Sequence, residues 1–220
     1  MNKPTLLAIL SGIGAALYLT AIRPCITRWG ATDTEARRML PGDEFTPEAR
    51  FISTHAITIN APPDKIWPWI VQIGNERAGW YSYRFVELLV NDGKLLDEGA
   101  SYRILPQFQA IQANDLIPVG NEAFKVIAVE PNHFLALKTG FDMVEDANSA
   151  DRTHSGFNFV LEPIDSQTTR LFARARFVSR SLLETLVLLS FLEPGHFIMQ
   201  TKMLHGIKQR AEGRFPLITG

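Results

Sequence analysis

The chain has 220 residues, of which 46% are hydrophobic, and this is enough for one domain with a sizeable core and an additional segment. Its 22 basic and 23 acidic residues give a formal net charge of -1 and are interspersed, which argues against the basic stripe of a nucleic-acid-binding protein. Cys25 is the only cysteine, so an internal disulfide and a cysteine-rich zinc site are excluded.

The N-terminal segment predicts a membrane anchor. Residues 5–22, TLLAILSGIGAALYLTAI, carry no charge over 18 positions, and a helix of this length extends about 27 Å, close to the thickness of a bilayer's hydrocarbon core. A cleaved signal peptide is the alternative, but the apolar run is longer than usual and no A-x-A cleavage site follows it. We therefore expect residues 1–22 to form a single-pass transmembrane helix.

The residues around this anchor bear on its orientation and association. Lys3 precedes it, whereas several arginines follow it, and positive charge is retained on the cytoplasmic side of a membrane. These arginines are Arg23, Arg28, Arg37 and Arg38. The soluble domain is thus expected in the cytoplasm. Small residues spaced four apart, such as Gly12 and Ala16, would also allow two anchors to pack as a dimer.

Residues 23–50, RPCITRWGATDTEARRMLPGDEFTPEAR, predict a linker, because prolines and glycines interrupt short polar stretches and no periodic apolar stripe is present. A strand follows, in which Ile57 and Ile59 alternate with smaller residues. Pro62-Pro63-Asp64 then predicts the start of a helix. One face of that helix is apolar, with Ile66, Trp69, Ile70 and Ile73.

The aromatic stretch GNERAGWYSYRF, residues 74–85, predicts a second helix that begins near Gly79. In such a helix Tyr81 and Phe85 would share a core-facing side. The adjacent side would carry Trp80, Tyr83 and Glu87, which have more polar groups than a core needs.

Residues 91–122 are rich in loop-forming residues, and four antiparallel strands are predicted after them, at 123–129, 133–139, 156–162 and 169–178. Residues 140–154 are expected to form an acidic loop. The C-terminal segment predicts a helix that is broken at Glu193-Pro194-Gly195 and then bears Met199, Met203 and Ile207 on one side.

Residues 182–192, LLETLVLLSFL, are too short to cross a bilayer and include Glu184. We expect them to pack in the core at the start of the final helix. The alternatives are a lid over a cavity or a helix that dips into the membrane interface.

The order of these elements resembles the SRPBCC superfamily, also called START or Bet v 1-like, over residues 50–212. The segments ITINAPPDKIWPWIVQIG, FKVIAVEPNHFLAL and EPGHFIMQTKMLHGIKQRAE carry the resemblance. RWGATDTEARRMLPGDE, AGWYSYRFVELL and RILPQF are similar to a bacterial subgroup with a hydrophobic N-terminus, although Ala113-Asn114-Asp115 replaces its usual Val-Gly-Asp turn. The resemblance implies an α+β helix-grip fold over 51–213, with a curved antiparallel sheet around a long C-terminal helix.

The resemblance also implies a cavity for lipids, polyketides or other apolar molecules. Aromatic and methionine side chains suit such a ligand, although each of them is equally suited to an ordinary core. The predicted ligand-binding residues are Trp80, Tyr83, Glu87, Phe157, Phe159, Met199 and Met203.

Charged residues suggest few sites. Burial of Glu87 among aromatic rings would favour its protonated form and suit it for proton transfer, although a helix-surface salt bridge with Arg84 is an alternative. Arg77 is expected at the surface rather than as a gate for an anionic group. One face of the last strand carries Arg170, Arg174 and Arg176, which we expect to face solvent rather than the cavity.

The five histidines are scattered, and the chain has no HExxH, P-loop or G-x-S-x-G motif. We therefore expect no metal and no cofactor. The sequence favours a membrane-anchored protein that binds a small hydrophobic ligand. A cyclase- or aromatase-like enzyme that uses Glu87 or a tyrosine is one alternative, and an interaction module without a ligand is another.

Overall fold

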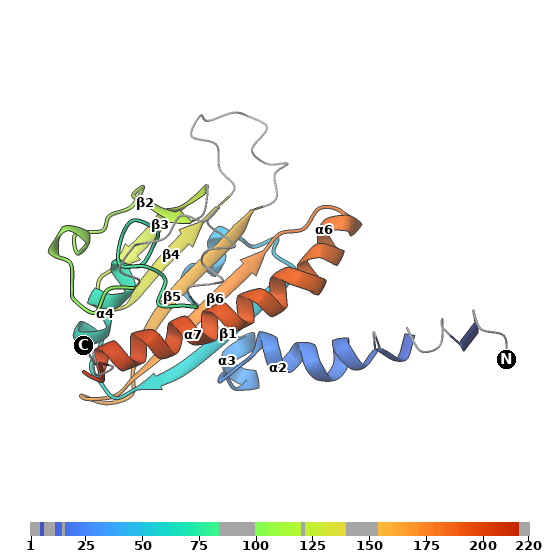
Figure 1. The fold of residues 1–220 in the computed structure, drawn as a ribbon, viewed down its shortest axis with the longest axis horizontal. Helices are drawn as coiled ribbons and strands as arrows, with labels where there is room; N and C mark the ends of the chain where they lie inside the picture. Colours follow the sequence, from blue (N-terminus) through green and yellow to red (C-terminus); the bar gives the residue numbers. More distant parts are fainter. Residues whose placement is uncertain are drawn as a thin grey trace, which may run out of the picture.

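The computed structural model describes residues 5–6, 12–14, 16–83, 100–119, 122–139 and 154–215. Within these residues, six antiparallel strands form one sheet that curves around a long C-terminal helix (Figure 1). The spatial order is β1-β6-β5-β4-β3-β2, so the first strand pairs with the last. The strands are β1 Phe51–Ile59, β2 Leu116–Val119, β3 Glu122–Glu130, β4 Phe134–Lys138, β5 Ser155–Pro163 and β6 Thr169–Phe177.

The α+β class and the predicted strands are confirmed. The four strands expected after residue 122 are β3 to β6, and each predicted end lies within one residue of the observed end. The sequence does not predict β2, because its four residues are too few for a clear alternation and include Pro118. Proline is tolerated there because β2 is an edge strand.

Side chains alternate between the two faces of the sheet. On β5, Phe157, Phe159 and Leu161 lie on the face that packs in the main hydrophobic core, which we call the inner face. Asn158 and Val160 lie on the opposite face, which we call the outer face. The alternating apolar positions of the sequence therefore separate two surfaces with different surroundings.

Two helices contribute to the core on the inner face. The long helix α7, Glu193–Ala211, buries Met203, Leu204 and Ile207, which confirms the predicted C-terminal helix. The shorter helix α4, Pro63–Val71, packs against α7 and begins at the predicted position. Proline at the first position of α4 costs no hydrogen bond, because the first N–H groups of a helix have no partner within it.

The predicted break at Glu193-Pro194-Gly195 is wrong. The helix is continuous from Leu182 to Ala211 and comprises α6 Leu182–Val187, η5 Leu188–Leu192 and α7. In a regular helix Pro194 would clash with the carbonyl group four residues earlier. The turn before it, η5, is instead a wider π-turn, in which the N–H of Glu193 donates to the carbonyl of Leu188. This wider turn accommodates the proline without ending the helix.

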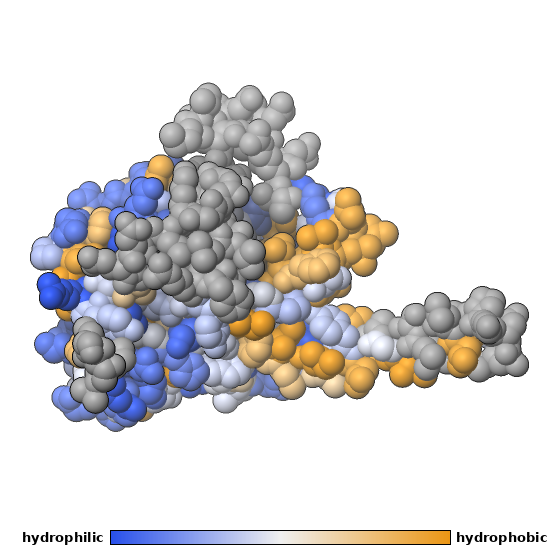
Figure 2. All heavy atoms as spheres, in the orientation of Figure 1, coloured by the Kyte–Doolittle hydropathy of each residue, from blue (hydrophilic) through white to orange (hydrophobic). Residues whose placement is uncertain are grey.

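The expectation that residues 182–192 pack in the core is also wrong. Leu182, Leu183 and Phe191 are 76%, 72% and 73% exposed. β6 ends at Phe177, and α6 lies past the end of this strand, where it forms part of an apolar surface (Figures 1 and 2). The apolar composition is that of a core helix, but the sheet does not extend far enough to cover it.

The chain before the sheet also contains helices. The π-turn η1, Tyr18–Ile22, continues into α2, Arg23–Thr27, within an apolar helix that spans Gly12–Thr27. Of the helices in the described residues, Leu182–Ala211 is the one that is long and apolar enough to cross a membrane. This signal is weak because a core helix passes the same test, and the second half of Leu182–Ala211 is the core helix α7.

Residues 28–46, which the sequence predicts as part of a linker, form a packed layer on the outer face. They include α3, Asp33–Arg37, and the 3-10 turn η2, Asp43–Phe45. Leu40 is buried against Val160 and Phe172 of the sheet. The sequence pattern does not reveal this layer, because most of its contacts with the sheet are polar rather than apolar.

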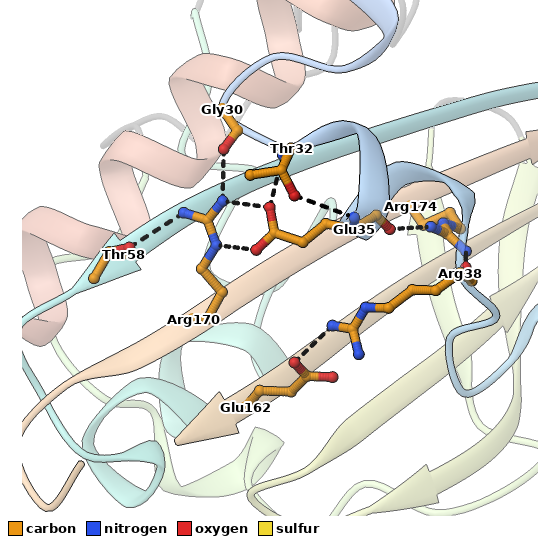
Figure 3. Close-up of polar contacts among 8 residues, drawn as sticks. All are labelled: Gly30, Thr32, Glu35, Arg38, Thr58, Glu162, Arg170 and Arg174. Atoms are coloured by element: carbon orange, nitrogen blue, oxygen red, sulfur yellow. Dashed lines mark hydrogen bonds and ion pairs between the residues drawn. The ribbon is translucent and has the colours of Figure 1, made fainter. Parts of the chain in front are cut away.

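Arg174 of β6 holds this layer in place (Figure 3). Its side chain is 2% exposed, and its Nη1 lies 2.5 Å from Oδ2 of the equally buried Asp43. The guanidinium group also donates to Thr54 Oγ1 and to the backbone carbonyls of Glu35, Ala36 and Arg38. All five of its N–H donors therefore have partners, and the cation caps the C-terminal end of α3.

Arg170 lies four residues before Arg174 on the same face of β6. It forms a bidentate pair with Glu35 (Figure 3). Glu35 also accepts a hydrogen bond from the N–H of Thr32, which caps α3. The Arg170 hydrogen bonds lower the pKa of Glu35 to about 2. The arginines of β6 thus face away from the cavity, as predicted, but residues 28–46 cover them, so the predicted exposure to solvent is wrong for Arg174 and Arg176.

Candidate functional site

A cavity of about 140 Å³ lies between the inner face of the sheet and α7, and it is partly open. β5 and β6 form one wall, α7 forms another, and the loop before residue 84 contributes the rest together with β2 and β3. Its lining residues are Trp80, Ser82, Val119, Phe124, Ser155, Gly156, Phe157, Ala175, Phe177, His196, Met199, Gln200 and Met203.

Aromatic rings make up much of the wall. The ring centroids of Phe157 and Phe124 are 5.9 Å apart, and those of Trp80 and Phe124 are 6.0 Å apart. Met199 and Met203 face these rings across the cavity from successive turns of α7. Thioether side chains adapt to irregular shapes, so this lining suits an apolar molecule that does not match the cavity rigidly.

A loop, rather than the predicted helix, positions Trp80. Gly74 and Gly79 form an isolated antiparallel bridge, and Tyr81 has a φ of 55°, which is incompatible with a right-handed helix. The bridge requires a φ of 129° at Gly74, a value that side chains rarely allow. The indole N–H of Trp80 donates to Asn75 Oδ1 at 2.8 Å, so the polar atom of the ring is satisfied outside the cavity.

Tyr81 fastens this loop to the core, which agrees with its predicted packing role. Its hydroxyl group donates to the carbonyl of Trp69 at 3.1 Å and accepts from Gln72 Nε2 at 2.9 Å. The guanidinium carbon of Arg210 lies 4.1 Å from the centre of its ring. Burial raises the pKa of Tyr81, so its phenol remains neutral.

Two polar residues of α7 interrupt the apolar lining. Nε2 of His196 and Oε1 of Gln200 are buried and have no hydrogen-bond partner among the described residues. Nε2 of Gln200 donates to the carbonyl of Ala173 at 3.1 Å, which orients the carboxamide and leaves Oε1 as the unpaired acceptor. A buried polar atom without a partner is costly, so these atoms are suited to a partner that a ligand brings.

His196 is neutral at ordinary pH. Burial, together with the nearby His55, lowers its pKa to about 3, against a smaller opposing effect of the Gln200 side chain one turn away. The ring centroids of the two histidines are 6.3 Å apart, and His55 Nε2 lies 2.7 Å from the carbonyl oxygen of Ile26. Burial likewise lowers the pKa of His55 to about 4. The part of the cavity wall formed by His196 and Gln200 therefore presents neutral polar groups rather than a cation.

The structure brings four of the predicted site residues together. Trp80, Phe157, Met199 and Met203 line the cavity. Phe159 shares a face with Phe157, as predicted, but it is fully buried in the core and does not line the cavity. Tyr83 is 42% exposed, and the Lys202 ammonium group lies 5.5 Å from the centre of its ring. Glu87, like Phe85 and Arg84, lies outside the described residues.

Sequence reasoning missed the polar part of the cavity, although a signal was present. His196, Met199, Gln200 and Met203 have spacings of three and four, so they occupy one side of α7. The histidines are scattered along the chain, and metal-site motifs such as HExxH do not detect a single histidine on one side of a helix. Arg77 is half-buried, donates to the carbonyl of Val71 at 2.7 Å and is not among the cavity-lining residues.

Among the residues that the structure describes, no group of three histidine, cysteine, aspartate or glutamate side chains is arranged to hold a metal ion. The cavity lining includes one titratable side chain within this part of the chain, that of His196. The observed site therefore consists of an apolar wall with two neutral hydrogen-bonding groups.

No family model and no curated protein matches the chain. Several solved structures have a similar backbone. The di-domain ARO/CYC BexL from the BE-7585A biosynthetic pathway is 13% identical over 74% of this chain and 46% of that chain, with a TM-score of 0.44. The Aha1 dimer from Colwellia psychrerythraea is 16% identical over 76% of this chain and 99% of that chain, with a TM-score of 0.39.

A point mutant of norcoclaurine synthase from Thalictrum flavum, in complex with a transition-state analogue, is 11% identical over 73% of this chain and 93% of that chain, with a TM-score of 0.41.

Proposed function

We propose that this protein is a membrane-anchored member of the SRPBCC superfamily that holds a small hydrophobic ligand between its sheet and α7. The observation that carries the proposal is an apolar cavity of about 140 Å³ into which a helix brings two polar residues with unpaired atoms. Other buried atoms of the chain also lack partners, such as Thr46 Oγ1 and Asn158 Nδ2, but those of His196 and Gln200 adjoin an apolar cavity that a ligand could enter. A small aromatic compound fits this description, as does one end of a lipid or polyketide that enters the partly open cavity.

The lining also defines the polarity of the ligand. No lysine or arginine is among the described lining residues, so an anionic ligand would lack a counter-charge. Oε1 of Gln200 accepts a hydrogen bond, and neutral His196 either donates or accepts one, according to its tautomer. The best match is a neutral, mostly apolar molecule of about ring size with a hydroxyl group at one end, because apolar cavities of roughly 150 Å³ hold benzene-sized molecules.

Membrane anchoring through residues 5–22 is the second part of the proposal. Its support is the uncharged stretch in the sequence and the exposure of Ile13, Leu17 and Leu19 on the N-terminal helix. A tethered domain would exchange an apolar ligand with the bilayer, where such molecules accumulate. The proposed arrangement is a single-pass anchor with the soluble domain in the cytoplasm.

The cavity favours binding over acid-base catalysis. His196 is the titratable residue of the described lining, and with a pKa of about 3 its imidazole is a weak base at neutral pH. The hydroxyl group of Tyr81 is engaged with Trp69 and Gln72 and does not line the cavity. We therefore assign the described residues no catalytic step.

The test is extraction and mass spectrometry of the apolar molecules that copurify with the full chain in lipid nanodiscs. Ala175→Leu fills the cavity from the inner face of β6 and is expected to abolish retention of the molecule found with the wild type. Ala110→Leu is the matched control, because Ala110 is exposed and does not line the cavity. An empty wild type, or equal retention in Ala175→Leu, would contradict the proposal.

Gln200→Leu tests the polar contact within the same cavity. It removes the unpaired acceptor and keeps the side chain's approximate size, so affinity for a hydroxyl-bearing ligand is expected to fall about tenfold, which corresponds to one lost hydrogen bond. Isothermal titration with the identified molecule measures this change. An unchanged affinity for that molecule would mean that Oε1 of Gln200 does not contact it.

A further inference from the structure

A strongly apolar surface lies on α6 and η5, outside the cavity. Its exposed side chains point away from the sheet and gather at one end of the molecule (Figure 2). A patch of this kind on a soluble domain marks an interaction site. Its members are Leu182, Leu183, Leu186, Val187, Phe191 and Leu192, with exposures from 42% to 76%.

This surface is joined to the N-terminal helix. The hydroxyl group of Tyr18 donates to the carbonyl of Leu189 at 2.8 Å. Five residues after Tyr18, the guanidinium group of Arg23 donates twice to the carboxylate of Glu193, at 2.9 and 2.7 Å. The Glu193 side chain is 3% exposed. The apolar side chains of η5 therefore continue the apolar surface of the helix that precedes α2.

The Tyr18 contact satisfies a carbonyl group that the helix itself leaves unpaired. In η5 a carbonyl pairs with the N–H five residues later, as Leu188 does with Glu193. For Leu189 that position is Pro194, which has no N–H. The Tyr18 hydroxyl group therefore leaves no unpaired carbonyl at this position, a condition that a hydrocarbon environment requires.

Two threonine hydroxyl groups, one on the N-terminal helix and one on α6, are likewise paired with backbone carbonyl groups. Thr20 Oγ1 donates to the carbonyl of Ala16 at 2.7 Å, and Thr185 Oγ1 donates to the carbonyl of Ser181 at 3.0 Å. Both threonines thus place their polar atoms within their own helices, as is common in membrane helices.

Charge is confined to the border of the surface. Arg180 precedes α6, and Arg50 precedes Phe51, whose strand partner is Phe177 at the end of β6; both arginines are exposed. Arg23 lies at the same level, because its guanidinium carbon is 5.7 Å from the centre of the Phe51 ring. Two carboxylates are also present: Glu193 is paired with Arg23, and Glu184 accepts from the N–H of Arg180. Basic groups at this border match the level of lipid phosphates.

From these contacts we infer that the α6–η5 surface docks into the lipid bilayer beside the N-terminal helix. The 11 residues of α6 and η5 extend about 16 Å, which is too short to cross the membrane. Arg180 precedes one end and Arg23 pairs with Glu193 at the other, so the segment lies along the surface of one leaflet, with both arginines at the headgroup level. His196, on the cavity wall, follows Leu192 by one helical turn. Docking therefore turns the cavity toward the bilayer. This inference rests on the proposed anchoring by residues 5–22 but not on the presence of a ligand.

Spin-label accessibility on the full chain tests the inference. Cys25 is exposed, so Cys25→Ser provides a background for single labels at Leu183→Cys and Phe191→Cys. Gln209→Cys is the matched control, because Gln209 is exposed at the other end of the same continuous helix. The probe membranes are vesicles of phosphatidylcholine and phosphatidylglycerol, and flotation measures association of the chain with them.

Docking predicts that the labels at 183 and 191 become severalfold more accessible to oxygen than to a water-soluble nickel complex, while the label at 209 keeps the reverse preference. If the chain floats with vesicles but the labels at 183 and 191 remain accessible to nickel, docking is wrong and the anchor stands. Spin–spin broadening between identical labels would show that a second copy covers the surface, which also overturns docking. A chain that does not float overturns the anchor and the docking together.

Discussion

The two faces of the same sheet bury polar groups in different surroundings. On the outer face, residues 28–46 lie against the strands, and each N–H donor of buried Arg174 has a partner from Thr54, Asp43 or the α3 layer. On the inner face, α7 leaves a cavity in which Nε2 of His196 and Oε1 of Gln200 lack partners among the described residues.

This difference distinguishes a structural use of buried polarity from a binding use. The paired donors of Arg174 fix one layer on another. Two outer-face atoms, Thr46 Oγ1 and Asn158 Nδ2, also lack partners among the described residues, but they do not line the cavity. Unpaired atoms beside an apolar cavity leave a position that a ligand completes. The many charges of the outer face are therefore poor indicators of function, and the two uncharged groups on α7 are better ones.

The largest effect is expected from breaking the outer-face network. Asp43→Ala removes the carboxylate that lies 2.5 Å from Arg174 and leaves a buried cation without its counter-charge. The expected loss in the free energy of unfolding is about 3–5 kcal/mol, measured by urea denaturation of the detergent-solubilised chain. Asp33→Ala is the control, because the Asp33 side chain is 67% exposed in its pairs with Arg28 and Arg37, and it should cost less than about 1 kcal/mol. Similar losses for the two variants would refute a special role for the buried pair.

The tightly packed part of the inner side provides the next test. A Cβ atom on Gly206 of α7 would lie 2.7 Å from Cβ of Tyr81 and 2.9 Å from its backbone oxygen. Gly206→Ala is expected to cost up to about 3 kcal/mol, because neither Tyr81 atom is at the end of a flexible side chain. For Gly195→Ala, on the same helix, no described atom lies within 4 Å, and we expect a neutral or slightly stabilising effect. Equal melting temperatures for the two variants would mean that the junction between α7 and Tyr81 is loose.

Acidification is expected to have a smaller effect on the free energy of unfolding, and this effect arises from His55 on the inner face of the sheet. The pKa of His55 is lowered to about 4, whereas an unfolded histidine titrates near 6.5. As the pH falls below 6.5, the unfolded chain takes up a proton that the native chain excludes, so stability that is complete at neutral pH is lost progressively toward pH 4. Between about pH 7 and pH 5 the loss is about 2 kcal/mol for this group.

His196, whose pKa is lowered to about 3, acts in the same direction. Glu35 contributes little between pH 7 and pH 5, because its stabilisation is lost only as the pH falls from the ordinary carboxylate value near 4.5 to its native pKa of about 2. Urea denaturation of the wild type and of His55→Gln at the two pH values checks the prediction, since the variant is expected to lose part of the pH dependence. An identical pH dependence in both proteins would assign it to other groups.

Local patterns in the sequence predicted most of the fold correctly. Alternation predicted β1 and β3 to β6, and Pro62-Pro63 predicted the start of α4. The predicted start of a helix near Gly79 was wrong, because aromatic residues at helical spacing do not reveal a Gly74–Gly79 bridge. Residues 84–99 lie outside the described residues. Four of the seven predicted site residues line the cavity, because aromatic and methionine side chains on inner-facing positions are either core or lining, and the pattern does not separate the two.

The sequence by itself determined which residues form strands and the long final helix, and which side of each strand is apolar, because these properties depend on neighbours a few positions apart. It also contains the uncharged N-terminal stretch from which we propose an anchor. Only the tertiary structure decided that Arg174 is buried, that residues 182–192 are exposed and that His196 and Gln200 line a cavity. Each of these depends on segments far apart in the chain, such as residues 35–43 against β6, which local periodicity does not relate.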